Sequence, residues 1–324
     1  MKTEGISFYD AHPGVASLRD EVLLGLSRSP RAIPPKFFYD ARGSDLFDQI
    51  CDQPEYYQTR TEMDILRGCV AELVTHIGEA CVLVELGSGA SKKVRLLLEG
   101  LKPSGYVGVD ISKEFLLDST ARLASDYPWL EVHAACVDFT HGLTIPHCEG
   151  QLHKVAFFPG SSIGNFVPDD ARHLLQDVGE LVGPGGHLLI GVDLKKDVRR
   201  LNDAYNDAAG ITEAFNKNLL HRIRAELDSD LDPDSFDHYA FYNPLEGRIE
   251  MHLISRVAQV VTVEGQRFSF ARGEGIHTEN SYKYTVAGFG ELAAGVGFRQ
   301  QAVWTDPDEL FSVQLLVFEP PTAG

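Results

Sequence analysis

The sequence predicts an α/β protein whose core is a doubly wound, mostly parallel sheet of seven strands, joined by an inserted α+β domain. Five short apolar runs between residues 82 and 193 alternate with stretches of helical spacing, as in successive β-α units. Glycines follow the first run directly, which is typical of a ligand-binding turn. Two more apolar runs, 297–304 and 310–318, predict an antiparallel pair of strands at one end of the sheet.

The first apolar run, Val82–Leu86, is followed by Gly87-Ser88-Gly89 and then by helical spacing from Ser91 to Gly100. This order predicts a buried strand, a tight glycine turn and a helix. A dinucleotide site would need a third glycine where this chain has Lys92. The acid Glu85 before the two glycines fits better a turn that holds the methionine part of S-adenosylmethionine.

Polar side chains stand at or just after the ends of four predicted strands. They are Glu85, Asp110, Asp138 and Asn165, after strands predicted at 82–86, 106–110, 131–136 and 154–158. Because ligands of open parallel sheets bind at the carboxyl ends of the strands, we expect these side chains to line one site. Asp110 lies about 20 residues beyond the glycines, the position of an acid that accepts hydrogen bonds from ribose hydroxyls.

Composition and charge exclude several classes of function. The chain has 29 basic and 47 acidic residues and a net charge of −18, which disfavours nucleic acid and anionic membrane surfaces as partners. There is no signal-peptide core and no membrane-length apolar run, so we expect a cytoplasmic protein. The five cysteines form no C-x-x-C pair and the 12 histidines no H-x-x-x-H pair, which predicts reduced thiols and no metal site. We expect a monomer whose partner is a small molecule.

Six motifs together carry a resemblance that covers nearly the whole chain. They are Pro35–Ser44, Pro54–Tyr57, Glu85–Gly89, Phe158–Phe166, Ala204–Gly210 and His277–Ser281. With them the chain resembles the histidine-specific Nα-methyltransferases of ergothioneine biosynthesis, and the first and fourth motifs are specific to that family. The resemblance implies a class I methyltransferase fold. It also implies transfer of three methyl groups from S-adenosylmethionine, without a metal, to the α-amino nitrogen of L-histidine, giving hercynine.

The resemblance also implies roles for single residues. Cofactor contacts are expected at Glu85, Gly87, Gly89, Lys93, Asp110, Asp138 and Phe139. The amino-acid head group is expected to meet Tyr56, Asn165 and Tyr205. An amide oxygen such as that of Asn165 can accept a hydrogen bond from the amine and hold its lone pair in line, while tyrosine hydroxyls can donate to the carboxylate. Tyr39 is the expected relay for the amine proton.

Glu279 and Ser281 carry the expected preference for histidine. A carboxylate makes a charge-assisted hydrogen bond with an imidazole N–H, and a hydroxyl reaches the second ring nitrogen. The two residues are two apart, so an extended backbone would point them the same way. Met251, between Ile249 and Leu253 in a strand-like run, is expected either to pack against the substrate ring or to be a core residue.

The chain is expected to divide into four segments. Residues 1–60 contribute to the substrate domain, and 61–194 form the S-adenosylmethionine-binding core, whose first helix Thr61 is expected to cap. Residues 195–285 form an inserted substrate-binding domain, and 286–324 return to the core sheet. Two alternatives stay open: methylation of another α-amino acid such as tryptophan, and a protein that binds S-adenosylmethionine without turnover.

Overall fold

The computed structural model describes residues 2–3, 6–11, 15–78, 80–89, 92–138, 142–143, 145 and 153–320. It divides into two compact units. The first unit comprises Met1–His12, Gln58–Lys196 and Tyr282–Gly324, and the second comprises Pro13–Tyr57 and Asp197–Ser281. The first 12 residues therefore belong to the first unit, whereas the sequence analysis grouped them with the other N-terminal residues.

The first unit is built on one large sheet with the strand order β1-β2-β6-β5-β4-β7-β8-β15-β14. Its strands are β1 (Lys2–Thr3), β2 (Ile6–Ala11), β4 (Val82–Leu86), β5 (Gly105–Asp110), β6 (Glu131–Val137), β7 (Lys154–Phe158), β8 (His187–Asp193), β14 (Phe298–Thr305) and β15 (Phe311–Phe318). The strands from β2 to β8 pair in parallel, and β15 and β14 add to the edge in antiparallel order. The seven predicted strands are all present. The short strands β1 and β2 extend the sheet beyond them.

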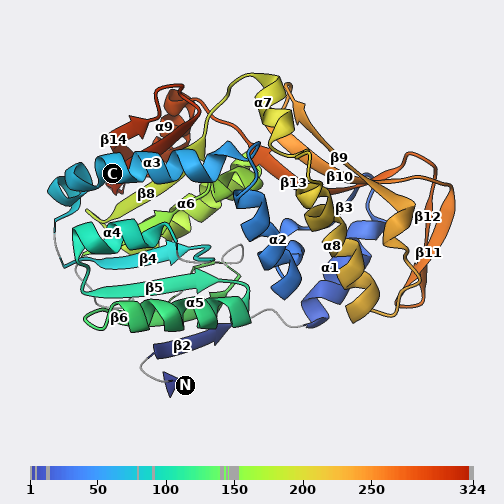
Figure 1. The fold of residues 1–324 in the computed structure, drawn as a ribbon, viewed down its shortest axis with the longest axis horizontal. Helices are drawn as coiled ribbons and strands as arrows, with labels where there is room; N and C mark the ends of the chain where they lie inside the picture. The colour runs from blue at the N-terminus through green and yellow to red at the C-terminus, as the bar shows by residue number, and fades with distance from the viewer. Residues whose placement is uncertain are drawn as a thin grey trace. The chain divides into compact units, whose positions relative to one another are not determined.

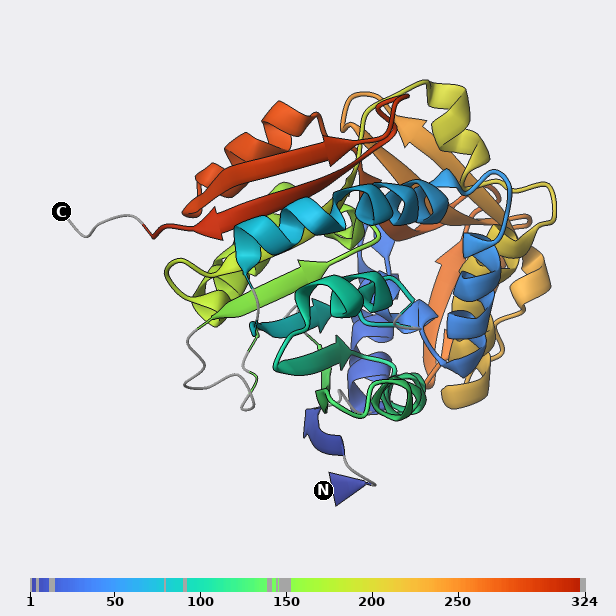
Figure 2. The same cartoon turned by 60° about the vertical axis from the view of Figure 1, so that its left-hand side comes forward.

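Helices cover both faces of this sheet (Figure 1 and Figure 2). One face packs against α3 (Tyr57–Ile77), α4 (Val94–Leu101) and α5 (Lys113–Asp126), and the other packs against α6 (Pro168–Val182) and α9 (Val286–Ala294). The strands β4 and β8 are buried along their whole length, as their apolar runs predicted. The prediction that Thr61 caps α3 is wrong, because the helix already begins at Tyr57.

The second unit combines helices with a smaller sheet of order β3-β13-β10-β9. Its strands are β3 (Arg31–Ala32), β9 (Phe236–Asn243), β10 (Arg248–Ser255) and β13 (Gly275–Tyr282), with a separate hairpin of β11 (Gln259–Val263) and β12 (Gln266–Phe270). Its helices are α1 (Val15–Ser27), α2 (Ala41–Cys51), α7 (Val198–Asp203) and α8 (Ile211–Glu226), with 3-10 turns at Pro35–Phe38 and Pro233–Ser235. Asn216 of α8 accepts from the Thr278 hydroxyl and donates to the His252 carbonyl, which fixes the helix to the sheet.

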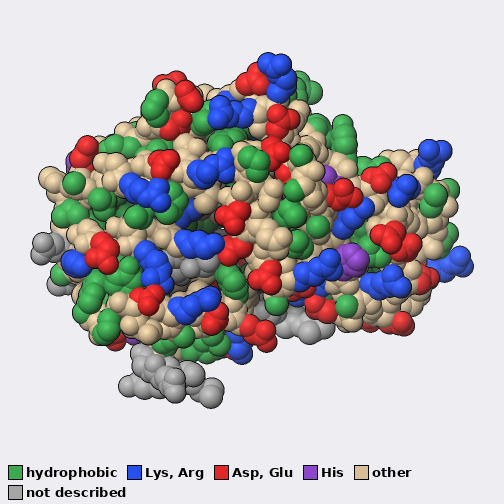
Figure 3. Space-filling model, in the orientation of Figure 1, with side chains coloured by type: hydrophobic (Ala, Val, Ile, Leu, Met, Phe, Trp, Pro, Cys, Tyr) green, Lys and Arg blue, Asp and Glu red, His purple; other side chains and the backbone are tan. Residues whose placement is uncertain are grey.

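Charged side chains of both signs are mixed on the surface. On the face drawn in Figure 3, Lys and Arg side chains lie among Asp and Glu side chains rather than in one continuous basic patch of described residues. No helix in the described ranges has the length and apolar character needed to cross a membrane.

Cys51, Cys69, Cys81 and Cys136 are free thiols, and the last three are buried.

Candidate active site

The glycine turn after β4 has the backbone that the sequence predicted. Gly87 and Gly89 adopt φ angles of 68° and 49°, a region in which side chains are strained. The Gly87 N–H donates to the Val109 carbonyl at 2.8 Å, and the Gly89 N–H donates to Oδ2 of Asp110 at 2.9 Å. The turn is therefore fixed to the end of β5. The Ser88 hydroxyl within it is buried and has no hydrogen-bond partner in the described part of the chain, as expected of a group that meets a ligand.

Two acids lie beside the turn, Glu85 buried and Asp110 half-buried, and they have different partners. Glu85 is 1% exposed and accepts from the Tyr106 hydroxyl at 2.6 Å, and burial raises the pKa of Glu85 to about 8. Asp110 accepts from the N–H of Ser112 at 2.9 Å, and burial raises its pKa from the ordinary value despite these backbone donors. Glu85 is therefore largely un-ionised at neutral pH in the free protein, and a cation beside it would favour its ionised form.

Lys93 lies just beyond the glycine turn, at the start of α4, and is paired with an acid that the sequence analysis missed. Its ammonium forms an ion pair with Glu62 of α3, whose side chain is fully buried. Glu62 shares the buried face of its helix with Ile65, Leu66 and Cys69. An acid at such a position in an apolar stripe is the signal that would have revealed it.

The loop that follows β7 holds Asn165 at the end of a 3-10 turn, Ser162–Asn165, where it is half-buried. The Gly160 N–H donates to the Glu62 carboxylate, and the Asp193 N–H donates to the Ser161 hydroxyl at 2.9 Å. Asp138 is half-buried directly after β6. Glu85, Asp110, Asp138 and Asn165 thus all lie at the carboxyl ends of parallel strands. Phe139 lies outside the described residues.

The second unit contains a cluster of aromatic side chains that includes three expected site residues. Tyr56 lies with its ring centroid 6.4 Å from that of Tyr205 and 6.3 Å from that of Phe47, and Tyr39 lies 5.8 Å from Phe47. Burial, followed by the nearby Tyr205, Cys51, Tyr39 and Glu279, raises the pKa of Tyr56 well above its ordinary value. The Tyr56 hydroxyl therefore stays protonated at physiological pH and can act as a neutral donor.

The Pro35–Ser44 motif builds the backbone around Tyr39. Asp40 caps α2 by accepting from the Gly43 N–H at 2.7 Å and also accepts from the Asn218 amide at 2.8 Å. A Cβ atom at Gly43 would lie 1.7 Å from the Phe38 carbonyl oxygen, so this position requires glycine. The motif therefore fixes the residues on either side of Tyr39.

Glu279 and Ser281 lie on β13, an extended segment that the sequence analysis left without a strand assignment. Both are buried, at 9% and 4% exposure. The Tyr205 hydroxyl donates to Ser281 Oγ at 2.8 Å, and the charge of Glu279 is among the causes that raise the pKa of Tyr56. The second unit therefore brings Tyr39, Tyr56, Tyr205, Glu279 and Ser281 together. Met251 is 1% exposed in β10.

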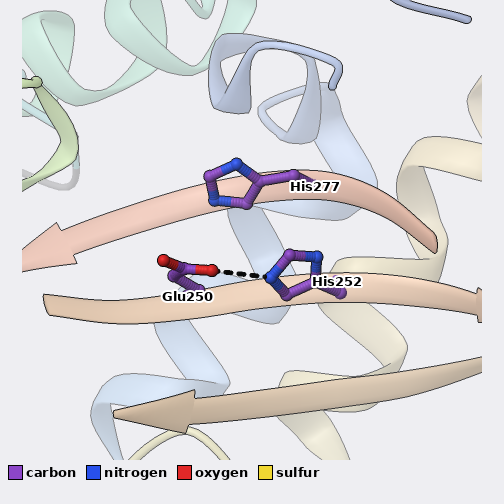
Figure 4. Close-up of side chains that lie close together, drawn as sticks. All are labelled: Glu250, His252 and His277. Atoms are coloured by element: carbon purple, nitrogen blue, oxygen red, sulfur yellow. Dashed lines mark hydrogen bonds and ion pairs between the residues drawn. The ribbon is translucent and has the colours of Figure 1, made fainter. Parts of the chain in front are cut away.

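Three residues with metal-type ligand atoms also lie close together in this unit. Ligand atoms of Glu250, His252 and His277 all fall within 4.8 Å of one another (Figure 4). Glu250, however, accepts from Asn243 at 3.0 Å, from Arg248 at 2.9 Å and from His252 at 3.0 Å, and its pKa is lowered to about 2. Because the carboxylate is already paired with a guanidinium, the contacts favour an ion-pair network over a cation site.

Comparison with known proteins gives the family of the chain. Residues 18–318 match the model of a family described as histidine-specific methyltransferase, SAM-dependent. The chain is 42% identical to the histidine N-alpha-methyltransferase of Mycolicibacterium smegmatis over 96% of its own length and 98% of the relative. It is 31% identical to ergothioneine biosynthesis protein 1 of Neurospora crassa, over 86% of this chain and 32% of that protein.

Among solved structures, an S-adenosylmethionine-dependent methyltransferase from Clostridium acetobutylicum matches with a TM-score of 0.50 and 12% identity, over 85% of this chain and 98% of that one. This likeness shows the class I methyltransferase fold alone. The family match spans both units and contains every described residue of the candidate site. The chain therefore belongs to the family of histidine-specific, S-adenosylmethionine-dependent methyltransferases.

Proposed function

We propose that this enzyme adds three methyl groups from S-adenosylmethionine to the α-amino nitrogen of L-histidine and so makes hercynine for ergothioneine biosynthesis. The observation that carries the proposal is the gathering of Tyr39, Tyr56, Tyr205, Glu279 and Ser281 in the second unit. These side chains offer donors for a carboxylate, and an acid and a hydroxyl for an imidazole. Binding of the substrate's carboxylate and imidazole is therefore assigned to the second unit, and methyl-donor binding to the first.

The imidazole is read by two hydrogen bonds. Glu279 accepts from one ring N–H in a charge-assisted bond, and Ser281 donates to the other ring nitrogen. An amino acid without these ring partners leaves a buried carboxylate unpaired, which strongly disfavours its binding. Met251 is proposed to pack against the ring from β10.

The methyl donor fits the glycine turn of the first unit. Gly87 has open space where a Cβ atom would stand, and Ser88 offers a buried hydroxyl. Asp110 is proposed to accept from the ribose hydroxyls, Lys93 to pair with the donor's carboxylate, and Glu85 to face its ammonium group. Asp138 is proposed to contact the adenosine, together with Phe139.

Each transfer forms one N–C bond and breaks one C–S bond, so three transfers to a protonated amine release three protons and three molecules of S-adenosylhomocysteine. Asn165 holds the amine lone pair in line with the methyl carbon, and Tyr39 relays the amine proton. Tyr56 and Tyr205 hold the carboxylate of the substrate. Most of the rate enhancement then comes from positioning.

Mass spectrometry of a reaction containing the protein, S-adenosylmethionine and an equimolar mixture of the twenty amino acids tests this proposal. Histidine alone should gain three methyl groups. Methylation of tryptophan or another amino acid would contradict the roles of Glu279 and Ser281, and bound donor without any product would indicate a binding protein. We also propose that the enzyme acts as a cytoplasmic monomer without nucleic-acid or membrane partners, in keeping with its net charge of −18.

A further inference from the structure

Glu62 touches three segments at the carboxyl edge of the large sheet. It forms an ion pair with Lys93, and its two carboxylate oxygens lie 3.0 and 2.9 Å from the Gly160 nitrogen. A Cβ atom at Gly191 in β8 would lie 1.9 Å from Glu62 Oε1, so a glycine there makes room for the carboxylate. The side chain itself is 0% exposed.

We propose that Glu62 is a positioning residue that fixes both reactants' contacts at once: Lys93 on the methyl-donor side, and the Gly160–Asn165 loop on the amine side. The inference rests on the proposed function, because it takes the roles of Lys93 and Asn165 from there. It adds a residue that contacts neither reactant and acts through two others.

Fold stability alone is a weak reason for this ion pair. Removing two charges from water costs about as much as their attraction returns, so an apolar pair of similar size would serve a core as well. The ion pair instead fixes the position of the Lys93 ammonium. An isolated lysine has a long, flexible side chain, whereas the ammonium of Lys93 is held by a carboxylate that is fully buried and also accepts from the Gly160 N–H. Lys93 also acts electrostatically on Glu85, so the held ammonium lies close to the glycine turn.

The loop of Asn165 depends on the same carboxylate. Gly160 and Ser161 both have positive φ angles, 78° and 58°. Glycine adopts such an angle without strain, whereas Ser161 keeps it only where hydrogen bonds hold the segment in place. Two anchors do so: the Gly160 N–H to Glu62, and the Ser161 hydroxyl, which accepts from the Asp193 N–H. Of these anchors only Glu62 carries a charge in the bond. Loss of its carboxylate therefore loosens the segment that ends in Asn165.

The substitution Glu62→Gln keeps the shape of the side chain and removes its charge. We expect the Kd for S-adenosylhomocysteine, measured by calorimetry, to rise about tenfold or more and kcat to fall by a similar factor. Glu62→Asp should recover part of both losses. The matched control is Glu72→Gln, on the same helix but exposed and bonded to the Trp304 indole, which should leave both constants within about twofold.

A second variant displaces the carboxylate without changing it. Gly191→Ala places a methyl group against Glu62 Oε1 and should reproduce the kinetic effects of Glu62→Gln. Its control is Gly105→Ala in β5, where the new Cβ atom would meet its nearest neighbour at an ordinary 3.7 Å. In a Lys93→Met background, Glu62→Gln should weaken S-adenosylhomocysteine binding by much less than in the native protein, because the two residues act through one contact.

Unchanged Kd and kcat in a folded Glu62→Gln variant would overturn the inference. If the variant also had a lowered Tm, the ion pair of Glu62 and Lys93 would have a purely structural role. Fully additive effects of the Glu62 and Lys93 substitutions on the Kd would show that Glu62 does not act through Lys93. If the native protein fails to methylate histidine, the proposed function fails instead. The Kd measurements separate that result, because they need no turnover.

Discussion

The hydroxyl of Tyr205 donates a 2.8 Å hydrogen bond to the hydroxyl of Ser281, and so joins the segment after α7 to strand β13. A serine that accepts from a tyrosine is oriented to donate its own proton to a further acceptor. The proposed acceptor is the second nitrogen of the substrate imidazole. Because Glu279 precedes Ser281 by two residues on the same strand, we propose that the pair binds a neutral imidazole through one accepting and one donating group.

Removing the Tyr205 hydroxyl should weaken histidine binding without affecting the methyl donor. For Tyr205→Phe we expect KM for histidine to rise about five- to twentyfold, the effect of losing a hydrogen bond worth about 1–2 kcal/mol. The Kd for S-adenosylhomocysteine should stay unchanged. Tyr239→Phe, on an exposed side chain of β9, is the control. Equal loss of both affinities in Tyr205→Phe would show that the tyrosine supports the fold rather than the substrate.

Removing the Glu279 carboxylate should lower the selectivity for histidine. For Glu279→Ala we expect kcat/KM for histidine to fall about thirty- to a hundred-and-fiftyfold, since a charge-assisted bond of about 2–3 kcal/mol is lost. The rate with tryptophan should fall less or rise, because no buried carboxylate is then left unpaired. Competition between the two amino acids in one reaction measures this ratio, and Glu246→Ala on an exposed turn is the control. An unchanged ratio would remove Glu279 from substrate recognition.

Binding of the methyl donor should depend on pH through Glu85. Burial raises the pKa of this carboxyl to about 8, so it is largely protonated at pH 7 and must lose its proton to pair with the ammonium group of the donor. Affinity should therefore rise between about pH 6 and pH 8, with release of a proton. Calorimetric titrations in buffers of different ionisation enthalpy measure the number of protons released when the donor binds. Glu85→Gln should bind more weakly at pH 8 and lose its part of the pH dependence; a native-like pH profile in this variant would assign the proton to another group.

Acid stability should depend on Glu250. Hydrogen bonds from Asn243, His252 and Arg248 lower the pKa of this carboxyl from 4.5 to about 2. A carboxyl group whose pKa is lowered by folding stabilises the folded state at any pH above its pKa in the unfolded chain. That stability is lost as the pH falls from about 5 towards 2. For Glu250→Gln we expect a free energy of unfolding about 1–3 kcal/mol lower than that of the native protein at pH 7. The difference between the two proteins should shrink towards pH 2. Urea titrations at several pH values measure it, and a pH-independent difference would contradict the assigned pKa.

The sequence predicted the parts of the fold that local patterns control. Buried strands such as β4 and β8 are continuous apolar runs, and the glycine turn needs positive φ angles at Gly87 and Gly89. Strand β2 was missed because a six-residue strand that pairs with β1 and with β6, which lies far along the chain, carries little local signal. The start of α3 was placed too late because Thr61, a residue type that commonly caps helices, was interpreted as the cap.

The site residues were predictable to a different extent. Those carried by motifs were named from the sequence, whereas Glu62 and the Glu250 network were not. Glu62 forms its ion pair with Lys93 across 31 residues of sequence. His277 lies close to Glu250 and His252 only because β13 and β10 are neighbouring strands of one sheet. Such contacts depend on tertiary packing, which no spacing of residue types along the chain determines.

Tandem mass spectrometry of the histidine product tests the central claim most directly, because it locates the transferred methyl groups. A reaction of the native protein with L-histidine and S-adenosylmethionine should give one final product that carries three methyl groups, all on the α-amino nitrogen, and the fragment that contains the imidazole should be unmodified. Methyl groups on the ring nitrogens would contradict the account, since the ring would then have to face the donor instead of Glu279 and Ser281.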